Sequence, residues 1–175
     1  MYTLAPDEKA SLVLVYAQDM LVRGELVTAK NARVSIWLRT QGVPDHILLL
    51  NAQILQLNTG SAKSFSYPEF YLPAGQIVAM HLAPPQADPL DYDPAEANRK
   101  MVPLNAFVGS FLFKGQMRVS TQTGGLGTSL DIAHAPWLSI YDVDISNPSL
   151  PQMPAMRVPM ALVRPSLISI GLDNG

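Results

Sequence analysis

The chain contains no cysteine, and charged and aromatic residues are scarce. The lack of cysteine excludes disulfide bonds, thiol catalysis and cysteine-ligated zinc. Charged residues make up only 15% of the 175 residues and the formal net charge is −2, so the overall charge does not attract a phosphate backbone. The composition therefore disfavours a disulfide-rich scaffold and a generally basic nucleic-acid-binding protein.

Long hydrophobic runs are missing as well. The longest run near the start, residues 12–17, is far too short to cross a bilayer. Asp7 and Glu8 precede it, where a signal peptide would carry basic residues. Together with the lack of cysteine, these features predict a soluble cytoplasmic protein with no membrane partner.

The residues that are abundant are apolar or turn-forming. Hydrophobic residues make up 48% of the chain, and 15 prolines and 11 glycines interrupt them. Such a composition favours short strands joined by turns over long helices, in a chain long enough for one domain or two small ones. We therefore predict an all-β fold.

Two segments of the chain align without a gap at an offset of 91 residues. Residues 21–54 match residues 112–145 in residue class and spacing. The coinciding polar and turn-forming positions are Gly24 with Gly115, Asn51 with Asp142, and Pro68 with Pro159. Any two β-rich segments share alternating apolar residues, but the shared offset of the glycine, the strands and the proline favours a duplicated β-unit.

The repeat and a proline-rich segment divide the chain into three parts. Residues 11–83 form the first predicted small β-barrel unit and residues 104–174 the second, each with about five short strands. Closure into barrels would remove exposed strand edges. Residues 84–103 are rich in proline and acidic residues, and we expect this linker to stay extended or disordered.

Local patterns add detail to the first unit. Gly24 inside a strand indicates a bulge or a sharp bend. Residues 33–39 fit a short helix and a strand equally, because their apolar residues lie four apart and also alternate. Residues 58–66 have the composition of a polar loop. Turn residues at 73–75, and at 164–165 in the second unit, predict that a hairpin closes each unit.

The glycine-bearing strand and the closing strands resemble those of Sm-like small β-barrels. The residues that carry this resemblance are Gly24, Leu50-Asn51-Ala52 and residues 71–77, and then Gly115, Tyr141-Asp142-Val143 and residues 162–168. Residues 33–52 also resemble an uncharacterised bacterial domain family. The Sm-like resemblance implies that three chains with two units each would close a ring of six barrels, with RNA as a possible ligand.

The chain departs from the Sm-like pattern in two places. The distance from Gly24 to Asn51 is longer than the first Sm-like motif, and the Arg-Gly pair of the family's RNA pocket survives only as Arg164-Pro165. A shared fold would therefore not carry RNA binding with it. The basic residues that could bind RNA are Arg23, Arg33, Arg39, Lys114 and Arg164. Solvated strand faces are the alternative interpretation of these residues.

Candidate metal-binding groups are few. Asp142 and Asp144 alternate along one strand and, with Asp131, could bind a divalent cation or act in acid–base chemistry. The first unit has neutral amides at the two positions equivalent to Asp142 and Asp144, which favours a solvated face instead. The glycine-rich residues 123–127 are expected to be a hairpin tip.

The histidines do not point to a metal site either. They are His46, His81 and His134. They lack zinc-binding spacing, and we expect them at loops or strand edges. No catalytic residue and no cofactor is predicted.

The sequence predicts a non-enzymatic binding or scaffolding protein of unknown ligand. High apolar content with little charge leaves surface that must be covered, so we expect a homo-oligomer that assembles through its β-units. RNA binding by an Sm-like ring is the first alternative. A divalent-metal-dependent enzyme built on Asp142 and Asp144 is the second.

Overall fold

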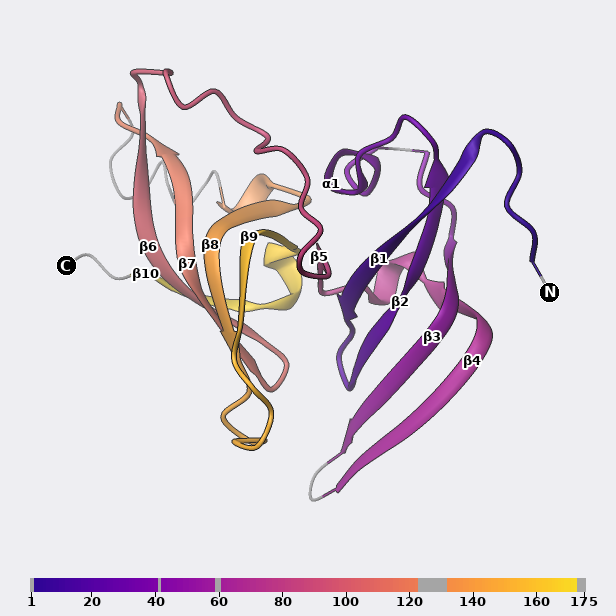
Figure 1. The fold of residues 1–175 in the computed structure, drawn as a ribbon. Coiled ribbons are helices and arrows are strands. Elements are labelled where there is room, and N and C mark those ends of the chain that lie inside the picture. The colour runs from indigo at the N-terminus through magenta and orange to yellow at the C-terminus, as the bar shows by residue number, and fades with distance from the viewer. Residues whose placement is uncertain (1, 41, 59–60, 123–131, 173–175) are drawn as a thin grey trace. The chain divides into compact units, whose positions relative to one another are not determined.

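The computed structural model describes residues 2–40, 42–58, 61–122 and 132–172, and these residues form an all-β fold. The chain divides into two compact units, Met1–Asp88 and Pro89–Gly175, which we call unit 1 and unit 2 (Figure 1). The predicted all-β class is confirmed. No helix in the described part of the chain is long and apolar enough to cross a membrane.

The described residues of unit 1 form five strands and two short helices. The strands are β1 (Glu8–Tyr16), β2 (Met20–Ala29), β3 (His46–Asn58), β4 (Ser61–Pro73) and β5 (Ala79–Leu82). The helices are α1 (Val34–Trp37) and the 3₁₀ helix η1 (Ala74–Gln76). Neighbouring strands follow the order β5-β1-β2-β3-β4, and every pair is antiparallel.

Unit 2 has the same order of elements along its sheet. Its strands are β6 (Arg99–Val108), β7 (Phe111–Ser120), β8 (Leu138–Ser146), β9 (Met156–Val163) and β10 (Ser169–Leu172), and its 3₁₀ helix is η2 (Pro165–Leu167). Neighbouring strands follow the order β10-β6-β7-β8-β9, again antiparallel throughout. Strand for strand, this is the order found in unit 1.

The last strand of each unit pairs with the first strand of that unit and not with the strand before it. β5 pairs with β1 and β10 pairs with β6, while β4 pairs with β3 and β9 with β8. The predicted hairpins at residues 73–75 and 164–165 are therefore wrong. The turn residues there form η1 and η2, which carry the chain from the last strand in the order of that unit to the side of its first strand. Among the described residues no backbone pairing joins β4 to β5 or β9 to β10, so the predicted barrel closure is not seen.

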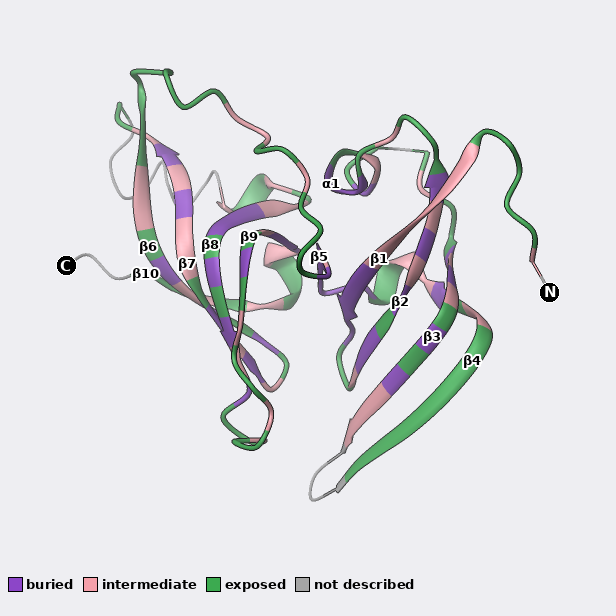
Figure 2. Ribbon diagram, in the orientation of Figure 1, coloured by how far each residue is buried: buried purple, intermediate pink, exposed green. Residues whose placement is uncertain are grey.

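Each sheet buries one apolar face around its bends. The largest fully buried side chains are Tyr16, Leu26, Ile47, Leu49, Leu72, Ile77 and Met80 in unit 1, and Leu104, Phe113, Met117 and Ile140 in unit 2. In Figure 2 buried stretches run along β1, β2, β3, β7, β8 and β9. Side chains alternate along β2, so from Val22 onward its outward-facing residues are half-buried or exposed, whereas β1 is buried on both faces from Val13 to Tyr16.

A left-handed residue bends β3 and β8 at equivalent positions. Asn51 and Asp142 both have φ of 50°, a conformation that asparagine and aspartate adopt more readily than other non-glycine residues. In β3 the buried side chains before the bend are at odd positions and those after it at even positions, as Leu49 and Ala52 illustrate. The bend therefore keeps the same side of the strand facing the core while the sheet curls.

The glycine in the second strand of each unit sits opposite this bend. The strand register shifts between Arg23 and Glu25 around Gly24, and between Lys114 and Gln116 around Gly115. The predicted bulge at Gly24 is thus confirmed, and unit 2 has one at the equivalent position. A side chain on either glycine would meet the bent partner strand.

The ambiguous residues 33–39 contain a helix. Val34 and Leu38 are both buried, whereas Ile36 between them is exposed. The spacing of four therefore decides the local structure, and the alternating pattern does not. The Ser35 N–H at the start of α1 donates to Asp88 Oδ2 at 2.9 Å, which ties the end of unit 1 to this helix.

Part of the segment predicted as an extended linker is anchored to the sheet of unit 2. Asp91 accepts hydrogen bonds from the hydroxyls of Ser139 at 2.7 Å and Tyr141 at 2.6 Å. The Tyr92 ring packs edge-on against Tyr141, with ring centroids 4.9 Å apart. This anchored segment, residues 91–96, we call the strap. Its polar and aromatic side chains find partners on the sheet, which composition alone did not reveal.

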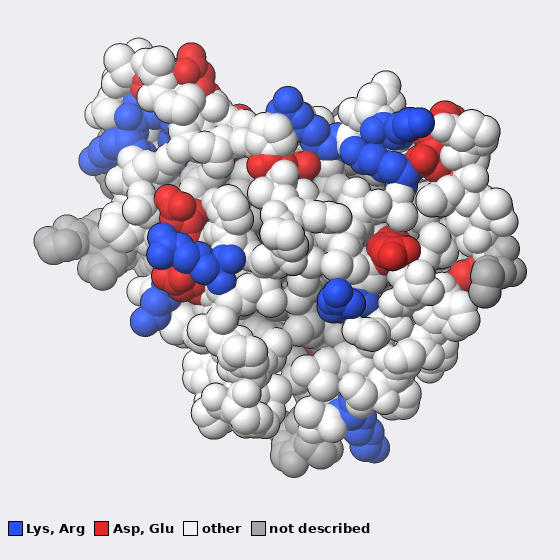
Figure 3. Space-filling view, in the orientation of Figure 1, with Lys and Arg blue, Asp and Glu red and all other residues white. Residues whose placement is uncertain are grey.

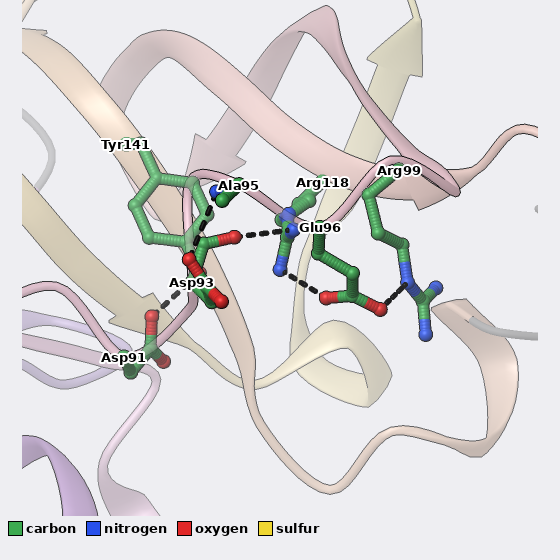
Figure 4. A network of polar contacts seen from close by, with 7 residues as sticks. All are labelled: Asp91, Asp93, Ala95, Glu96, Arg99, Arg118 and Tyr141. Carbon is green, nitrogen blue, oxygen red and sulfur yellow. Dashed lines mark hydrogen bonds and ion pairs between the residues drawn. The ribbon is translucent and has the colours of Figure 1, made fainter.

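Arg118 of β7 holds the other end of the strap. Its guanidinium donates to the Asp93 carbonyl at 2.8 Å, forms an ion pair with Glu96 at 2.8 Å, and lies 4.5 Å from the centre of the Tyr92 ring. Glu96 also pairs with Arg99 at 3.5 Å (Figure 4). One arginine thus makes three contacts with a six-residue segment.

Replacing Arg118 with alanine is expected to release the strap while unit 2 stays folded. The variant loses the partly exposed ion pair with Glu96 and the stacking on Tyr92. This loss should weaken the attachment of the strap by about 1 kcal/mol, which corresponds to about a fivefold rise in the fraction of molecules with a detached strap. Limited chymotrypsin digestion at Tyr92 would measure this as a faster cut. Arg157→Ala removes an exposed pair with Asp144 at 3.9 Å and serves as the control. Equal cutting rates in both variants would contradict the role of Arg118.

Candidate functional site: the apolar surface of β4

β4 lies at the end of the strand order of unit 1 and exposes aromatic side chains along its length. Phe65, Tyr67 and Tyr71 are 42%, 46% and 57% exposed, unusual fractions for such large apolar groups. Figure 2 shows β4 as a long exposed strand beside the partly buried β3. Over the described residues, β3 is the strand with which β4 pairs. β4 is therefore an edge strand with an apolar surface.

An open hollow of about 290 Å³ lies beside the edge strand. Its lining comes from β2, β3 and β4, and the residues are Met20, Ile54, Gln56, Phe65, Tyr67 and Phe70. The rings of Tyr67 and Phe70 stack with centroids 6.0 Å apart. Apart from the Tyr67 hydroxyl, Gln56 supplies the polar group of this lining. We call the hollow with Phe65 and Tyr67 the β4 surface.

The β4 surface belongs to the inner face of the sheet. Phe65 is paired with Ile54, and Tyr67 with Ala52, and residues opposite each other in an antiparallel pair share a face. Ala52 and Ile54 are buried in the core of unit 1. The apolar face thus continues from the core onto the edge strand, where part of it is left open.

The opening in unit 1 accompanies a hairpin that is longer than its counterpart in unit 2. β3 and β4 have 13 residues each, whereas β8 and β9 have 9 and 8. Three lining residues of the hollow, Met20, Tyr67 and Phe70, correspond at an offset of 91 to Phe111, Val158 and Ala161 of unit 2. All three of these residues in unit 2 are buried. The same face is therefore closed in unit 2 and extended in unit 1.

Tyr2, which precedes β1, contacts the other end of β4. The Tyr2 N–H donates to Glu69 Oε1 at 2.5 Å, and the Tyr71 hydroxyl donates to Glu69 Oε2 at 3.3 Å. The Tyr2 hydroxyl is held by the Glu8 carboxylate, which raises the pKa of Tyr2. Tyr2 thus lies by Glu69, and among the described residues none before Met20 lines the hollow.

Sequence reasoning missed this surface because residues 58–66 have the composition of a polar loop. In the structure, residues 61–66 belong to β4, so the loop prediction is wrong. The serines and aromatic residues alternate in Ser64-Phe65-Ser66-Tyr67, which is the period-2 signal of a half-buried strand. That short alternation was the available signal.

The predicted RNA-binding residues lie on several different elements. In unit 1, Arg23 is on β2, 3.4 Å from Gln53 Oε1, while Arg33 and Arg39 flank α1; all three are exposed. In unit 2, Lys114 is exposed on β7. Figure 3 shows Lys and Arg in small groups with Asp and Glu among them, separated by wide uncharged areas. The structure does not gather the three arginines of unit 1 on one element.

Arg164 differs from the other candidate cations. Its guanidinium carbon lies 4.7 Å from the centre of the Trp137 ring, a cation–π arrangement. Partial burial lowers the pKa of Arg164, since the charged form loses hydration. This pair joins the turn before η2 to the start of β8 and presents a stacked aromatic and cationic surface.

The two predicted metal ligands are exposed on β8. Asp142 is the left-handed residue of the bend, and Asp144 forms a loose pair with Arg157 at 3.9 Å. Asp131, the third predicted ligand, lies outside the described residues, as do residues 123–127. Among the residues that the structure does describe, no group of three or more His, Asp or Glu side chains is close enough to hold a metal ion.

His81 is buried, contrary to the prediction that the histidines lie at loops or strand edges. His81 is on β5 and its Nε2 accepts a hydrogen bond from the Tyr16 hydroxyl at 3.0 Å. Its Nδ1–H donates to the Leu82 carbonyl at 2.8 Å. Burial lowers the pKa of His81 to about 4 and raises the pKa of Tyr16. His46 and His134 are exposed.

No family model, no curated protein and no solved structure matches this chain. The resemblances to Sm-like proteins and to an uncharacterised bacterial family therefore stay predictions. Function has to be inferred from the surfaces of the molecule. The β4 surface is the strongest of these, because it combines a strand edge, exposed aromatic side chains and a hollow.

Proposed function

We propose that this protein is a non-enzymatic binding or scaffolding protein that assembles with copies of itself through its β-units. The observation that carries the proposal is the β4 surface, on which Phe65 and Tyr67 stay 42% and 46% exposed beside an apolar hollow. An unpaired strand edge offers backbone donors and acceptors to another strand. Exposed aromatic residues supply the apolar area that interface cores favour.

We further propose that the two units arose by duplication of one Sm-like unit. Three observations support this. The strand order is the same in both units, η1 and η2 are 91 residues apart, and the left-handed residues Asn51 and Asp142 have the same offset. In this proposal three chains close a ring of six units, with each chain binding the next in the same way. We place the protein in the cytoplasm, as its cysteine-free composition suggests.

Self-assembly predicts that the double substitution Phe65→Ser with Tyr67→Ser converts an oligomer into a monomer. Both side chains are exposed in the single chain, so their loss should leave the fold of unit 1 intact and remove the apolar contact. Light scattering behind size exclusion would give the mass of each species. Ile36→Ser, an equally exposed apolar residue on α1, is the control and should keep the wild-type mass. A monomeric wild-type protein would overturn the proposal.

RNA binding is a second candidate, which the stacked pair of Arg164 and Trp137 favours. Aromatic and arginine side chains of this kind can stack on unpaired bases. The same chromatography with absorbance recorded at 260 and 280 nm tests this candidate. Bound nucleic acid that is lost from Arg164→Ala would support it, and a protein-like spectrum with no salt-sensitive oligonucleotide shift would count against it.

A further inference from the structure

We propose that the β4 surface binds strand β10 of a second copy of this chain, so that the copies assemble head to tail. The inference rests on the proposed self-assembly and names the partner segment. Over the described residues, β10 is an edge strand as well: it pairs with β6 and lies at the end of the strand order of unit 2. The two strands offer each other a free backbone edge.

The side chains of β10 match those of β4 face by face. Ile170 and Leu172 are opposite the buried Ala106 and Leu104, so they lie on the inner, apolar face of unit 2. Leu172 is nevertheless 36% exposed, because the sheet ends there. The outer face of β10 carries only Ser169 and Gly171.

The same division occurs on β4. Its inner face carries Phe65 and Tyr67 beside the hollow, and its outer face carries Ser64 and Ser66. An antiparallel pairing of β4 with β10 would put aromatic residues beside Ile170 and Leu172, the cross-strand combination that stabilises sheets. The small residues would meet on the other face without crowding. Charge does not oppose the pairing, because Ser169–Leu172 contains no charged residue.

The hollow supplies a place for one aliphatic side chain of the incoming strand. Its volume of about 290 Å³ and its lining by Met20, Ile54 and Phe70 suit a leucine or isoleucine. Binding would cover apolar area on both partners, which supplies the driving force. Because β4 and β10 are different surfaces, each copy would keep one of them available for the next copy. A heterologous contact of this kind closes into a ring or continues as a filament.

The absence of cysteine makes cross-linking a clean test. Ser66→Cys on β4 and Ser169→Cys on β10 introduce single thiols at exposed outer-face positions. Mixed in equal amounts and oxidised, the two variants should give a disulfide-linked dimer. Each variant alone should give no more dimer than the control Thr40→Cys, which is exposed elsewhere on unit 1. A second experiment mixes Ser64→Cys with Ser169→Cys. It tests a pairing of β4 with β10 that is shifted by two residues.

The outcomes separate this inference from the proposed function. Cross-linking confined to the mixture supports the pairing of β4 with β10. Efficient dimerisation of Ser66→Cys alone would mean that β4 binds β4, and would overturn the inference. An oligomeric wild type with no cross-link in either arm would overturn the inference and leave self-assembly standing. A monomeric wild type would overturn both.

Discussion

Unit 1 is expected to lose about 3 kcal/mol of stability between pH 7 and pH 4 through a single side chain, His81. Burial lowers the pKa of His81 from 6.5 to about 4, because a charged imidazolium would lose its hydration. The hydrogen bonds match the neutral ring, with Nε2 accepting from Tyr16 and Nδ1–H donating to Leu82. The native state therefore keeps this histidine neutral down to about pH 4.

The direction of the effect follows from proton binding in the two states. In the unfolded chain His81 titrates near its ordinary pKa of 6.5. Between pH 6.5 and pH 4 the unfolded state therefore takes up a proton that the native state does not. The stabilisation is fully present above pH 6.5 and is lost progressively as the pH falls toward 4. The lowering of the pKa corresponds to about 3 kcal/mol at the acid end of this range.

Urea unfolding at pH 7, 6, 5 and 4 would measure this loss in unit 1. The chain has two tryptophans, Trp37 in unit 1 and Trp137 in unit 2, so a Trp137→Phe background reports on unit 1 alone. His81→Gln cannot titrate and still offers Tyr16 an acceptor. Between pH 7 and pH 4, the free energy of unfolding of unit 1 should therefore fall by about 3 kcal/mol less in this variant than in the wild type.

The matched control for this experiment is His46→Gln. His46 is exposed at the start of β3, so its removal should leave the pH dependence as in the wild type. If His81→Gln and the wild type lose the same stability between pH 7 and pH 4, the loss originates in other groups and the assigned role of His81 is wrong.

Local features of the fold could be predicted from the sequence because they depend on nearby residues. Alternating apolar residues indicate strands whatever their partners are, and Gly24 in a strand indicates a bulge. The bulge around Gly24 therefore appears where we expected it, whereas residues 61–66 and 99–103 form strands where we expected a loop and a linker. The helix at residues 33–39 was undecided, since burial of Val34 and Leu38 against the rest of unit 1 selects one of two compatible patterns.

Strand partners could not be predicted, because pairing depends on distant parts of the chain. Pro73 and Gly75 suit a hairpin turn and a 3₁₀ turn equally, and the choice depends on whether β1 offers an edge to β5. His81 was misplaced for the same reason: its burial requires Tyr16, which is 65 residues away. The strap depends likewise on Arg118, which lies beyond the strap in sequence.

The β4 surface could not be predicted for the same reason, because it depends on the pairing of β4 with β3. Residues 61–66 contain serines and few aliphatic residues, so their composition resembles that of a loop. Their strand structure follows from pairing with β3. Once paired, Phe65 and Tyr67 continue the buried face of Ala52 and Ile54. The candidate site therefore follows from the length of one hairpin, which the difference between the two units makes visible and composition does not.

Gly115→Ala is expected to destabilise unit 2 by about 3 kcal/mol, and the equivalent Gly24→Ala to cost unit 1 only about 1 kcal/mol. A Cβ on Gly115 would lie 2.7 Å from the Tyr141 carbonyl oxygen and 2.7 Å from Ile140 Cγ2. The carbonyl is part of the bent strand β8 and cannot move without shifting the sheet. The nearest atoms to a Cβ on Gly24 are at 3.2 and 3.3 Å, so smaller shifts would relieve the contact.

Unfolding of each unit, followed through its own tryptophan, would test this difference. Trp37→Phe leaves Trp137 to report on Gly115→Ala, and Trp137→Phe leaves Trp37 to report on Gly24→Ala. Gly75→Ala is the control, because a Cβ there meets no atom within 4 Å. Equal stability losses for Gly24→Ala and Gly115→Ala would contradict the prediction. The bend of β8 lies closer to Gly115 than the bend of β3 lies to Gly24. A larger loss of stability in unit 2 would therefore show that the glycine and the bend are more tightly packed there.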